Sequence, residues 1–501
     1  MSEPFDTYKK FRNKIADLSF EDSFAAMWAF SQYTQINDFD FPRDVEKHHT
    51  FTSNGHSQPY CWQLETVVRE VVLNSSPASR RGKSLKRWGD LAEIVNSLRS
   101  LEDVIHQQTL SQHNVLLEML RVAHQQFPWQ TRVSTRLIGR YFQVFNAPEI
   151  DAICEKLTGL TVRKIYAIGS GTWGVLTSKA FIKAPMQSTI KGISDEDLAA
   201  FFKLFSKELY ALRGEIKEQH IVDDAYAYDS RAIRAHPLIA LRHGGRDFIA
   251  CPLPTLLFWR FTSGLYYDLA AEPDFFNEFG ASFQKYVGEV LARALKGSKL
   301  KFLAEEKYGK KGKTKDTIDW LVLDDTAVVF VECKTKRLSL DAKTKLVSRD
   351  ALLKDVGILA DAIVQVYKTI AEYQAGKYPS LAFNDALQIH PMIVTLENWY
   401  PLGDPIGAEL NKAACEKLTS AGLSPELLQQ MPYTIASAEE FEVAAQIIAK
   451  VGCAKFFAGK GDKQYKGWML DGYMSHAFKA EQKEAVNLFN GTYDEILEPF
   501  K

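Results

Sequence analysis

The chain has 501 residues, of which 46% are hydrophobic and 25% charged, and its formal net charge at pH 7 is −1. This composition is that of an ordinary globular protein, and the length predicts about two to four domains. It excludes a chain that binds nucleic acid through an overall basic excess, so a phosphate-binding surface has to be local.

Targeting signals and cysteine chemistry are also constrained by the sequence. The first residues are polar, and no run of about 18 apolar residues occurs, so we expect neither a signal peptide nor a membrane span. The six cysteines are far apart and form no CxxC pair. This spacing argues against a disulfide framework and a structural zinc site. We therefore expect a cytoplasmic protein with no membrane partner.

The first half, residues 1–270, is predicted to be a mainly helical module that senses or docks. Apolar residues recur at helical spacing, and turn-forming residues interrupt them. The expected helices lie near 91–105, 114–127 and 195–220, with breaks at 74–83 and 126–130 and short β-like runs at 161–168 and 180–185. Aromatic residues near 258–267 are expected to lie in a core.

One motif in this half invites a nucleotide-binding interpretation. The stretch from Gly169 to Gly174 matches GxGxxG and follows a β-like run. No convincing amphipathic helix opens after it, and the chain has neither an HRD nor a DFG motif. We therefore interpret it as a turn with structural glycines.

The second half, residues 271–501, is predicted to be an α/β domain with a mixed central sheet flanked by helices and with C-terminal additions. The elements expected in chain order are a helix at 275–295, a strand at 300–305, a lysine-rich loop, strands at 317–323 and 327–334, a helix at 350–373 and a strand at 390–399. The additions are helices near 406–420, 438–450 and 479–498 and a strand at 432–437.

The two strands at 317–323 and 327–334 carry the most informative residues. A hairpin whose two-residue loop is Asp325-Thr326 makes Asp324 face Ala327 and Asp319 face Glu332. Cβ atoms of such opposed residues lie about 5 Å apart on one face. Lys334 follows two residues after Glu332 and projects from the same face. The rest of the hairpin is apolar on both faces, which predicts a buried position within a layered domain.

Two carboxylates and an ammonium group in a buried hairpin need a partner or a metal ion. Mg²⁺ prefers oxygen ligands and typically takes one or two carboxylates plus phosphate and water. We expect Asp319 and Glu332 to bind Mg²⁺ or Mn²⁺, with the backbone carbonyl of Cys333 as a third ligand. Lys334 would orient the attacking water or offset the developing negative charge. These residues together predict a metal-dependent phosphodiester hydrolase.

Ile318-Asp319 followed by Glu332-Cys333-Lys334 resembles the D…ExK signature of the PD-(D/E)xK nuclease superfamily, over about residues 275–400. The resemblance implies a restriction-endonuclease-like fold, in which the Asp and Glu bind Mg²⁺ and the Lys assists the water. It also implies a nucleic-acid substrate, with DNA favoured. The combination of a large module with a compact nuclease resembles bacterial phage-defence effectors, in which residues 1–270 would bind a protein trigger.

Supporting residues and one alternative complete these expectations. Gln284 stands where the superfamily often has a metal-supporting Glu, and Gln365 resembles a glutamine that some of these nucleases use near the site. The missing Glu leaves open an alternative, a catalytically weak or inactive fold that binds nucleic acid or protein. Local basic residues are the expected nucleic-acid contacts, namely Lys310, Lys311, Lys313, Lys315, Lys336 and Arg337.

Overall fold

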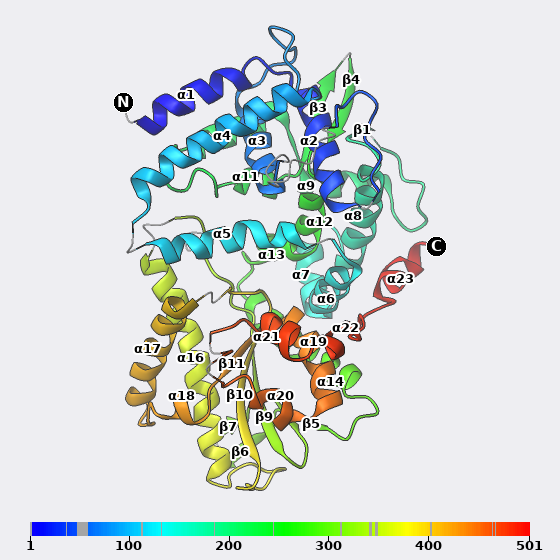
Figure 1. Ribbon diagram of the computed structural model, residues 1–501. Coiled ribbons are helices and arrows are strands. Elements are labelled where there is room, and N and C mark those ends of the chain that lie inside the picture. Colours follow the sequence, from blue (N-terminus) through cyan, green and yellow to red (C-terminus); the bar gives the residue numbers. More distant parts are fainter. Residues whose placement is uncertain are drawn as a thin grey trace. The chain divides into compact units, whose positions relative to one another are not determined.

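The computed structural model describes residues 3–36, 38–47, 59–111, 114–131, 133–184, 186–243, 245–310, 313–339, 343–345, 349–400, 403–462, 464–465 and 467–501. The chain, drawn in Figure 1 with colours that follow the sequence, forms two compact units. The first unit comprises Met1–Val115, His124–Phe275 and Gly491–Lys501, and the second comprises Leu116–Ala123 and Phe276–Asn490. The main division falls at Phe275–Phe276.

The first unit is mainly helical and also contains a four-stranded sheet in the order β1-β4-β3-β2. Its strands are β1 (Phe181–Ala184), β2 (Ser206–Glu208), β3 (Leu238–His243) and β4 (Arg246–Ala250). Its helices are α1 (Glu3–Ile15), α2 (Phe20–Gln35), α3 (Cys61–Asn74), α4 (Trp88–Thr109), α6 (Thr135–Phe145), α7 (Pro148–Thr158), α8 (Val162–Leu176), α9 (Asp195–Phe205), α10 (Leu209–Gln219), α11 (Arg231–Ala235), α12 (Pro254–Phe261), η1 (Ser263–Leu265), α13 (Tyr266–Leu269), α23 (Thr492–Leu497) and η2 (Glu498–Phe500).

The interpretation of the GxGxxG stretch as a turn after a strand is wrong, because the stretch lies inside helix α8. Thr161 caps this helix by accepting a hydrogen bond from the backbone N–H of Lys164. The apolar run after Thr161 is therefore a buried helix face, and its β-branched residues suggested a strand. A Cβ at Gly169 would lie 2.6 Å from Cγ of Phe261, so glycine lets this ring pack against the helix.

The break predicted at 126–130 is also wrong, because helix α5 (Val115–Gln130) continues through Pro128. Its residues Leu116–Ala123 belong to the second unit and its later residues to the first. Proline removes one helical hydrogen bond, but the neighbouring Trp129 is buried. Its indole donates to Glu65 at 3.3 Å, and its ring centroid lies 4.6 Å from that of Trp259. This packing holds the last helical turn in place.

The second unit is a mixed α/β domain around a five-stranded sheet in the order β11-β10-β9-β8-β5. Strands β9, β10 and β11 are parallel, whereas β8 is antiparallel to both β9 and β5. The strands are β5 (Lys301–Ala304), β6 (Lys307–Lys310), β7 (Lys313–Asp316), β8 (Trp320–Leu323), β9 (Ala327–Lys334), β10 (Gln388–Thr395) and β11 (Thr434–Ser437). The helices are α14 (Phe275–Ala294), α16 (Arg349–Gln374), α17 (Gly403–Ser420), α18 (Leu427–Gln430), α19 (Ala438–Val451), α20 (Cys453–Ala458), α21 (Leu470–Ala477) and α22 (Lys479–Lys483).

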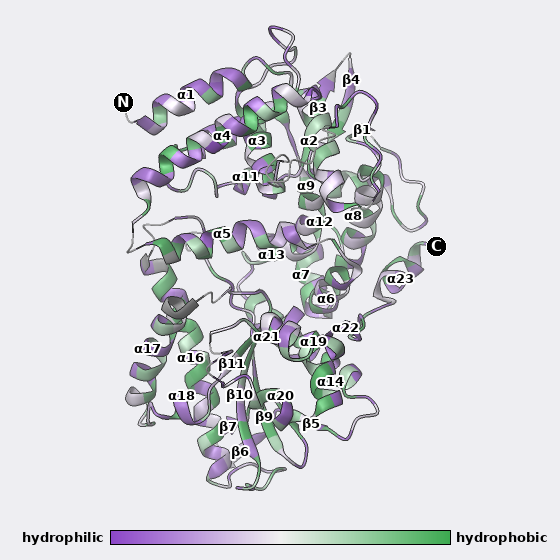
Figure 2. Ribbon diagram, viewed as in Figure 1, coloured by the Kyte–Doolittle hydropathy of each residue, from purple (hydrophilic) through white to green (hydrophobic). Residues whose placement is uncertain are grey.

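Helices cover both faces of this sheet (Figure 1). Leu321, Val328 and Phe330 form one core with α16 and α17. Val329 and Val331, on the opposite face, pack against α14 and α19. Strand β9 is accordingly drawn mostly in the hydrophobic colour in Figure 2. A strand buried on both faces reads as a continuous apolar run, as predicted.

The predicted hairpin register is confirmed. Trp320 pairs with Val331 and Leu323 with Val328, and the backbone N–H of Asp324 donates to the carbonyl of Ala327. The Asp324 carboxylate accepts from the backbone N–H groups of Thr326 and Ala327, which fixes the tight turn.

Two other predictions need correction. The lysine-rich segment is not a loop, because β6 and β7 pair as an antiparallel hairpin. The single helix expected at 479–498 is two helices, α22 and α23, and Gly491 between them has φ of 102°. Such a backbone angle cannot continue a right-handed helix. Among the described helices, none is both long and apolar enough to cross a lipid bilayer.

Candidate active site

Three of the predicted site residues come together at the end of the β8–β9 hairpin. Asp319 directly precedes β8, and its Oδ2 accepts a hydrogen bond from the backbone N–H of Cys333 at 2.6 Å. Glu332 is the residue opposite Asp319 when the observed register is continued by one step. Lys334 donates from Nζ to Oε1 of Glu332 at 2.6 Å. The constellation therefore follows from the short turn and from strand alternation.

Cys333 contributes through its backbone. In a strand, the N–H and C=O of one residue point toward the same neighbouring strand. Since the Cys333 N–H donates to Asp319, the carbonyl of Cys333 points toward this edge as well. This direction agrees with the role predicted for that carbonyl. Burial, together with the nearby carboxylates, raises the pKa of the Cys333 thiol well above its usual range, so this thiol is not a reactive nucleophile.

The two carboxyl groups lie in a poorly solvated place, and Glu332 is 6% exposed. Burial, followed by repulsion from Glu332, raises the pKa of Asp319 to about 7. Burial also raises the pKa of Glu332, against the opposing effect of Lys334. Burial disfavours the ammonium group of Lys334, but Glu332 and Asp319 outweigh it and raise the pKa of Lys334. The site thus has more buried negative charge than its single lysine balances.

Strand β5 and helix α14 add two neighbours to the site. The backbone N–H of Glu305 donates to the carbonyl of Asp319 at 3.0 Å, and Glu305 is a further repulsive charge on both Asp319 and Glu332. Gln284, the predicted supporting residue, donates from Nε2 to Oε2 of Glu305 at 3.3 Å. Sequence reasoning missed Glu305 because its place depends on the pairing of β5 with β8.

The predicted role of Gln365 receives no support from its position. Its side chain is exposed on α16, in a stripe with Asp361 and Lys368. Within the part of the chain that the structure describes, no hydrogen bond joins this side chain to Asp319, Glu332 or Lys334. The structure therefore does not bring Gln365 to the site.

The lysines and the arginine predicted to contact nucleic acid differ in whether their charge is paired with a carboxylate of the protein. Lys336 forms an ion pair with Asp355 at 2.9 Å, and the buried Arg337 forms one with Glu397 at 3.1 Å. Lys315 pairs with Glu372 at 2.7 Å, whereas Lys310 lies exposed in β6. Lys311 and the side chain of Lys313 lie outside the described part. The hairpin β6–β7 therefore offers more available charge than the segment after the ExK motif.

The residues of the site could supply only some of the ligands of a metal ion. The described residues contain no group of three or more His, Cys, Asp and Glu side chains arranged to hold a metal. The oxygen donors at the site are the carboxylates of Asp319 and Glu332 and the carbonyl of Cys333. That set suits Mg²⁺ or Mn²⁺, which keep several water or phosphate oxygens around them. A cation would also offset the excess buried negative charge.

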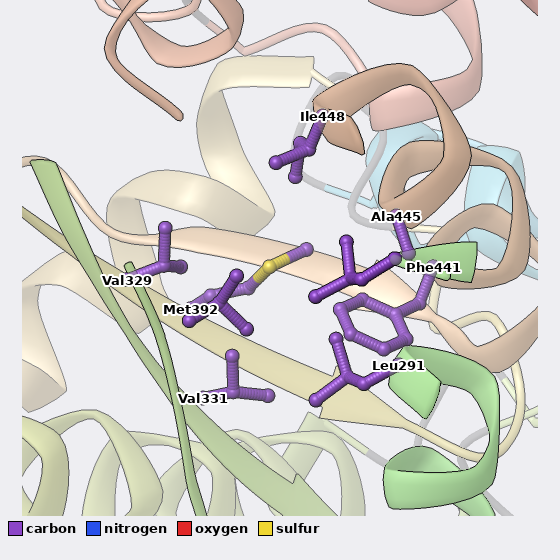
Figure 3. A pocket seen from close by; sticks show the side chains of 9 residues that line it. Leu291, Val329, Val331, Met392, Phe441, Ala445 and Ile448 are labelled. Carbon is purple, nitrogen blue, oxygen red and sulfur yellow. The ribbon is translucent and has the colours of Figure 1, made fainter. Parts of the chain in front are cut away.

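On the other face of the sheet, the described residues enclose a small apolar void. This void of about 10 Å³ is lined only by apolar side chains from the sheet, α14 and α19 (Figure 3). Val331 and Met392 are among its lining residues. Such a void is about the size of one water molecule and lacks polar partners for it. It is a packing gap and not a ligand site.

Comparisons of the chain with family models, curated proteins and solved structures yield no match.

Proposed function

We propose that the second unit is a metal-dependent nuclease that hydrolyses phosphodiester bonds, with Asp319, Glu332 and Lys334 as its active-site residues. The observation that carries the proposal is the pair of poorly solvated, mutually repelling carboxylates held beside one lysine by the hairpin register. Purely structural carboxylates in protein interiors are normally balanced by donors or cations. Carboxyl groups whose pKa is raised by burial together with a facing carboxylate occur often at functional sites.

Asp319 and Glu332, with the Cys333 carbonyl, would hold Mg²⁺ or Mn²⁺. When bound, such an ion polarises the scissile phosphate and makes a water molecule more acidic. Asp319 is held in position by the Cys333 N–H, so little reorganisation is needed on binding. Lys334 already faces Glu332 and would donate to the attacking water or to the phosphate oxygen on which charge develops.

The fold that we propose for this unit is restriction-endonuclease-like. Helix α14, strands β5, β8 and β9, helix α16 and strand β10 follow one another in the order that the sequence resemblance implies. DNA is the substrate we favour, because the restriction endonucleases and recombination exonucleases of that superfamily cut DNA. The exposed Lys310 on β6 supports a contact with a phosphate backbone.

The biological setting that we propose is prokaryotic defence against phage in the cytoplasm. A unit without these catalytic residues accompanies the nuclease unit in one chain, which suits an effector activated by a protein trigger. This part of the proposal rests on analogy of architecture.

The test is a cleavage assay on the purified full chain. Plasmid DNA, linear duplex DNA, single-stranded DNA, RNA and tRNA are each incubated with Mg²⁺, Mn²⁺ or EDTA. We expect metal-dependent cleavage of DNA, which Asp319→Asn and Glu332→Gln abolish while circular dichroism shows a folded protein. Wild-type activity in either folded variant would refute the assignment. Nucleic-acid binding by the wild type without metal-dependent cleavage would favour the alternative of an inactive binding module.

A further inference from the structure

The register of the sheet places a third carboxylate in line with the two already described. Ala304 pairs with Trp320, and the Glu305 N–H donates to the Asp319 carbonyl at 3.0 Å, so Glu305 lies opposite Asp319. Asp319 in turn lies opposite Glu332. Opposed residues of antiparallel strands share a face of the sheet. Glu305, Asp319 and Glu332 therefore form one row across β5, β8 and β9.

Helix α14 holds the first member of this row. Gln284 donates from Nε2 to Oε2 of Glu305 at 3.3 Å. The backbone carbonyl of Gln284 accepts a hydrogen bond from the indole of Trp320 at 3.0 Å. One turn later, Gly288 leaves room for the Trp320 ring, because a Cβ there would collide with it. These contacts fix the position of Gln284 over the start of β8.

The next residue in the chain makes a useful contrast. The carboxylate of Glu306 accepts a hydrogen bond from the hydroxyl of Ser380, and its backbone N–H donates to the Thr317 hydroxyl at 2.8 Å. Strand alternation turns its side chain away from the row. Glu306 is therefore engaged elsewhere. Glu305 is exposed, and among the described residues its carboxylate accepts a side-chain hydrogen bond from Gln284 alone.

We propose that Glu305 is a positioning residue of the metal site, which accepts hydrogen bonds from water molecules in the cation's hydration shell, and that Gln284 orients it. This inference rests on the proposed function. Among the residues that the structure describes, Glu305 does not complete a group of three ligating side chains, and a role through water is consistent with that arrangement. Mg²⁺ and Mn²⁺ retain several waters, and carboxylates in the outer shell orient them. Gln284 on α14 and Glu305 after β5 would thus together replace the metal-supporting Glu that the superfamily often has at the position of Gln284.

The test measures Mn²⁺ binding to the full chain by isothermal titration calorimetry. Loss of an outer-shell partner typically lowers metal affinity about 10–100-fold. We expect a loss in this range for Glu305→Gln and a smaller one for Gln284→Ala. The matched control Glu306→Gln should bind Mn²⁺ as the wild type does. Thermal unfolding of the metal-free proteins should occur at no lower temperature in Glu305→Gln than in the wild type, because loss of a structural contact would lower it.

The outcomes separate this inference from the proposed function. If Asp319→Asn abolishes Mn²⁺ binding while Glu305→Gln binds like Glu306→Gln, the site stands and the role of Glu305 is refuted. If the wild type binds no Mn²⁺, or binds it as Asp319→Asn does, the proposed function fails and this inference fails with it. Glu305→Asp supplies a further check, since a shorter carboxylate should restore part of the affinity and an unchanged loss would contradict a water-mediated role.

Discussion

Glu70 in the first unit and Asp319 in the second are both shielded from solvent, but their surroundings are opposite. Glu70 is fully buried and accepts hydrogen bonds from Tyr8, Arg69 and Asn74, with His220 at 3.0 Å. Burial alone would raise the pKa of Glu70, yet Arg69 and His220 outweigh it and lower the pKa to about 2. The charge of Glu70 is satisfied within the protein.

Asp319 has one backbone donor and faces a second carboxylate. Its pKa is raised to about 7 by burial and by Glu332, and Lys334 compensates only in part. Glu70, whose charge is balanced, connects α1, α3 and the residues after α10 and needs no ligand. Asp319, whose charge is not balanced, is stabilised by an external cation or a proton. This difference, and not burial itself, distinguishes a structural ion network from a candidate site.

The largest effect is expected where the satisfied network is broken. Glu70→Ala leaves the buried Arg69 without its carboxylate and should destabilise the protein by about 3–5 kcal/mol. Urea unfolding followed by circular dichroism measures the change. The control Lys156→Ala removes a partner of an exposed ion pair in the same unit and should shift the midpoint far less. Equal shifts in the two variants would show that the Glu70 network is not structural.

Lys334→Ala tests the other side of the comparison, where one cation faces excess negative charge. Cleavage should fall about 10²–10³-fold, the scale of losing one electrostatic stabiliser of a transition state. Mn²⁺ affinity should hold or rise, because a competing cation has been removed. Turnover and Mn²⁺ titration on one preparation give both values. A variant that loses affinity for nucleic acid while the wild type shows no metal-dependent turnover would indicate a binding module.

Local patterns were sufficient to predict the hairpin and to bring Asp319, Glu332 and Lys334 together on it. Strand alternation and the turn at Asp324 determine the register over a few residues, and the observed pairs agree with it. The failures are of two kinds. In α8, β-branched and aromatic residues suggested strand, whereas a cap at Thr161 and burial of one face support a helix. In α5, the packing of Trp129 outweighs the break that Pro128 suggests.

Contacts between distant segments were beyond the reach of the sequence. The position of Glu305 depends on the pairing of β5 with β8, across the intervening hairpin β6–β7. Whether the charge of Arg337 is available to a ligand depends on its ion pair with Glu397, which follows β10. The exposed position of Gln365 depends on which face of α16 meets the sheet. No local periodicity encodes such partners, so Glu305 was missed, and Gln365 and Arg337 were proposed without knowledge of their neighbours.

The pH dependence of stability should separate the two carboxylates. Glu70 has a lowered pKa, so its contribution is present above about pH 4.5 and is lost as the pH falls toward 2. Asp319 has a raised pKa, so in metal-free protein its ionisation lowers stability as the pH rises from about 4 to about 7. Asp319→Asn should therefore be more stable than wild type above pH 7, by about 1–3 kcal/mol.

Chemical unfolding in EDTA at pH 4, 6 and 8 measures this difference. The two proteins should converge at pH 4, where Asp319 is protonated in the folded state. Addition of Mn²⁺ should stabilise only the wild type at pH 8. An Asp319→Asn variant that is less stable than wild type at pH 8 without metal would mean that the carboxylate is satisfied, like Glu70.

The smallest expected effect concerns the lysines of hairpin β6–β7, in which the same contrast between engaged and available charge recurs. Lys315 forms an ion pair with Glu372 at 2.7 Å, while Lys310 is exposed in β6.

Each phosphate contact contributes about 0.9 to the slope of log affinity against log salt on duplex DNA. Lys310→Ala should therefore reduce this slope by up to about one, and Lys315→Ala by less, because Glu372 competes with phosphate for Lys315. Binding is measured at salt concentrations from about 50 to about 200 mM, with Asp319→Asn present in every protein to prevent cleavage. If Lys310→Ala leaves the slope unchanged, the hairpin does not contact the backbone. If Lys315→Ala has the larger effect, the ion pair with Glu372 opens on binding, and engaged charges are available after all.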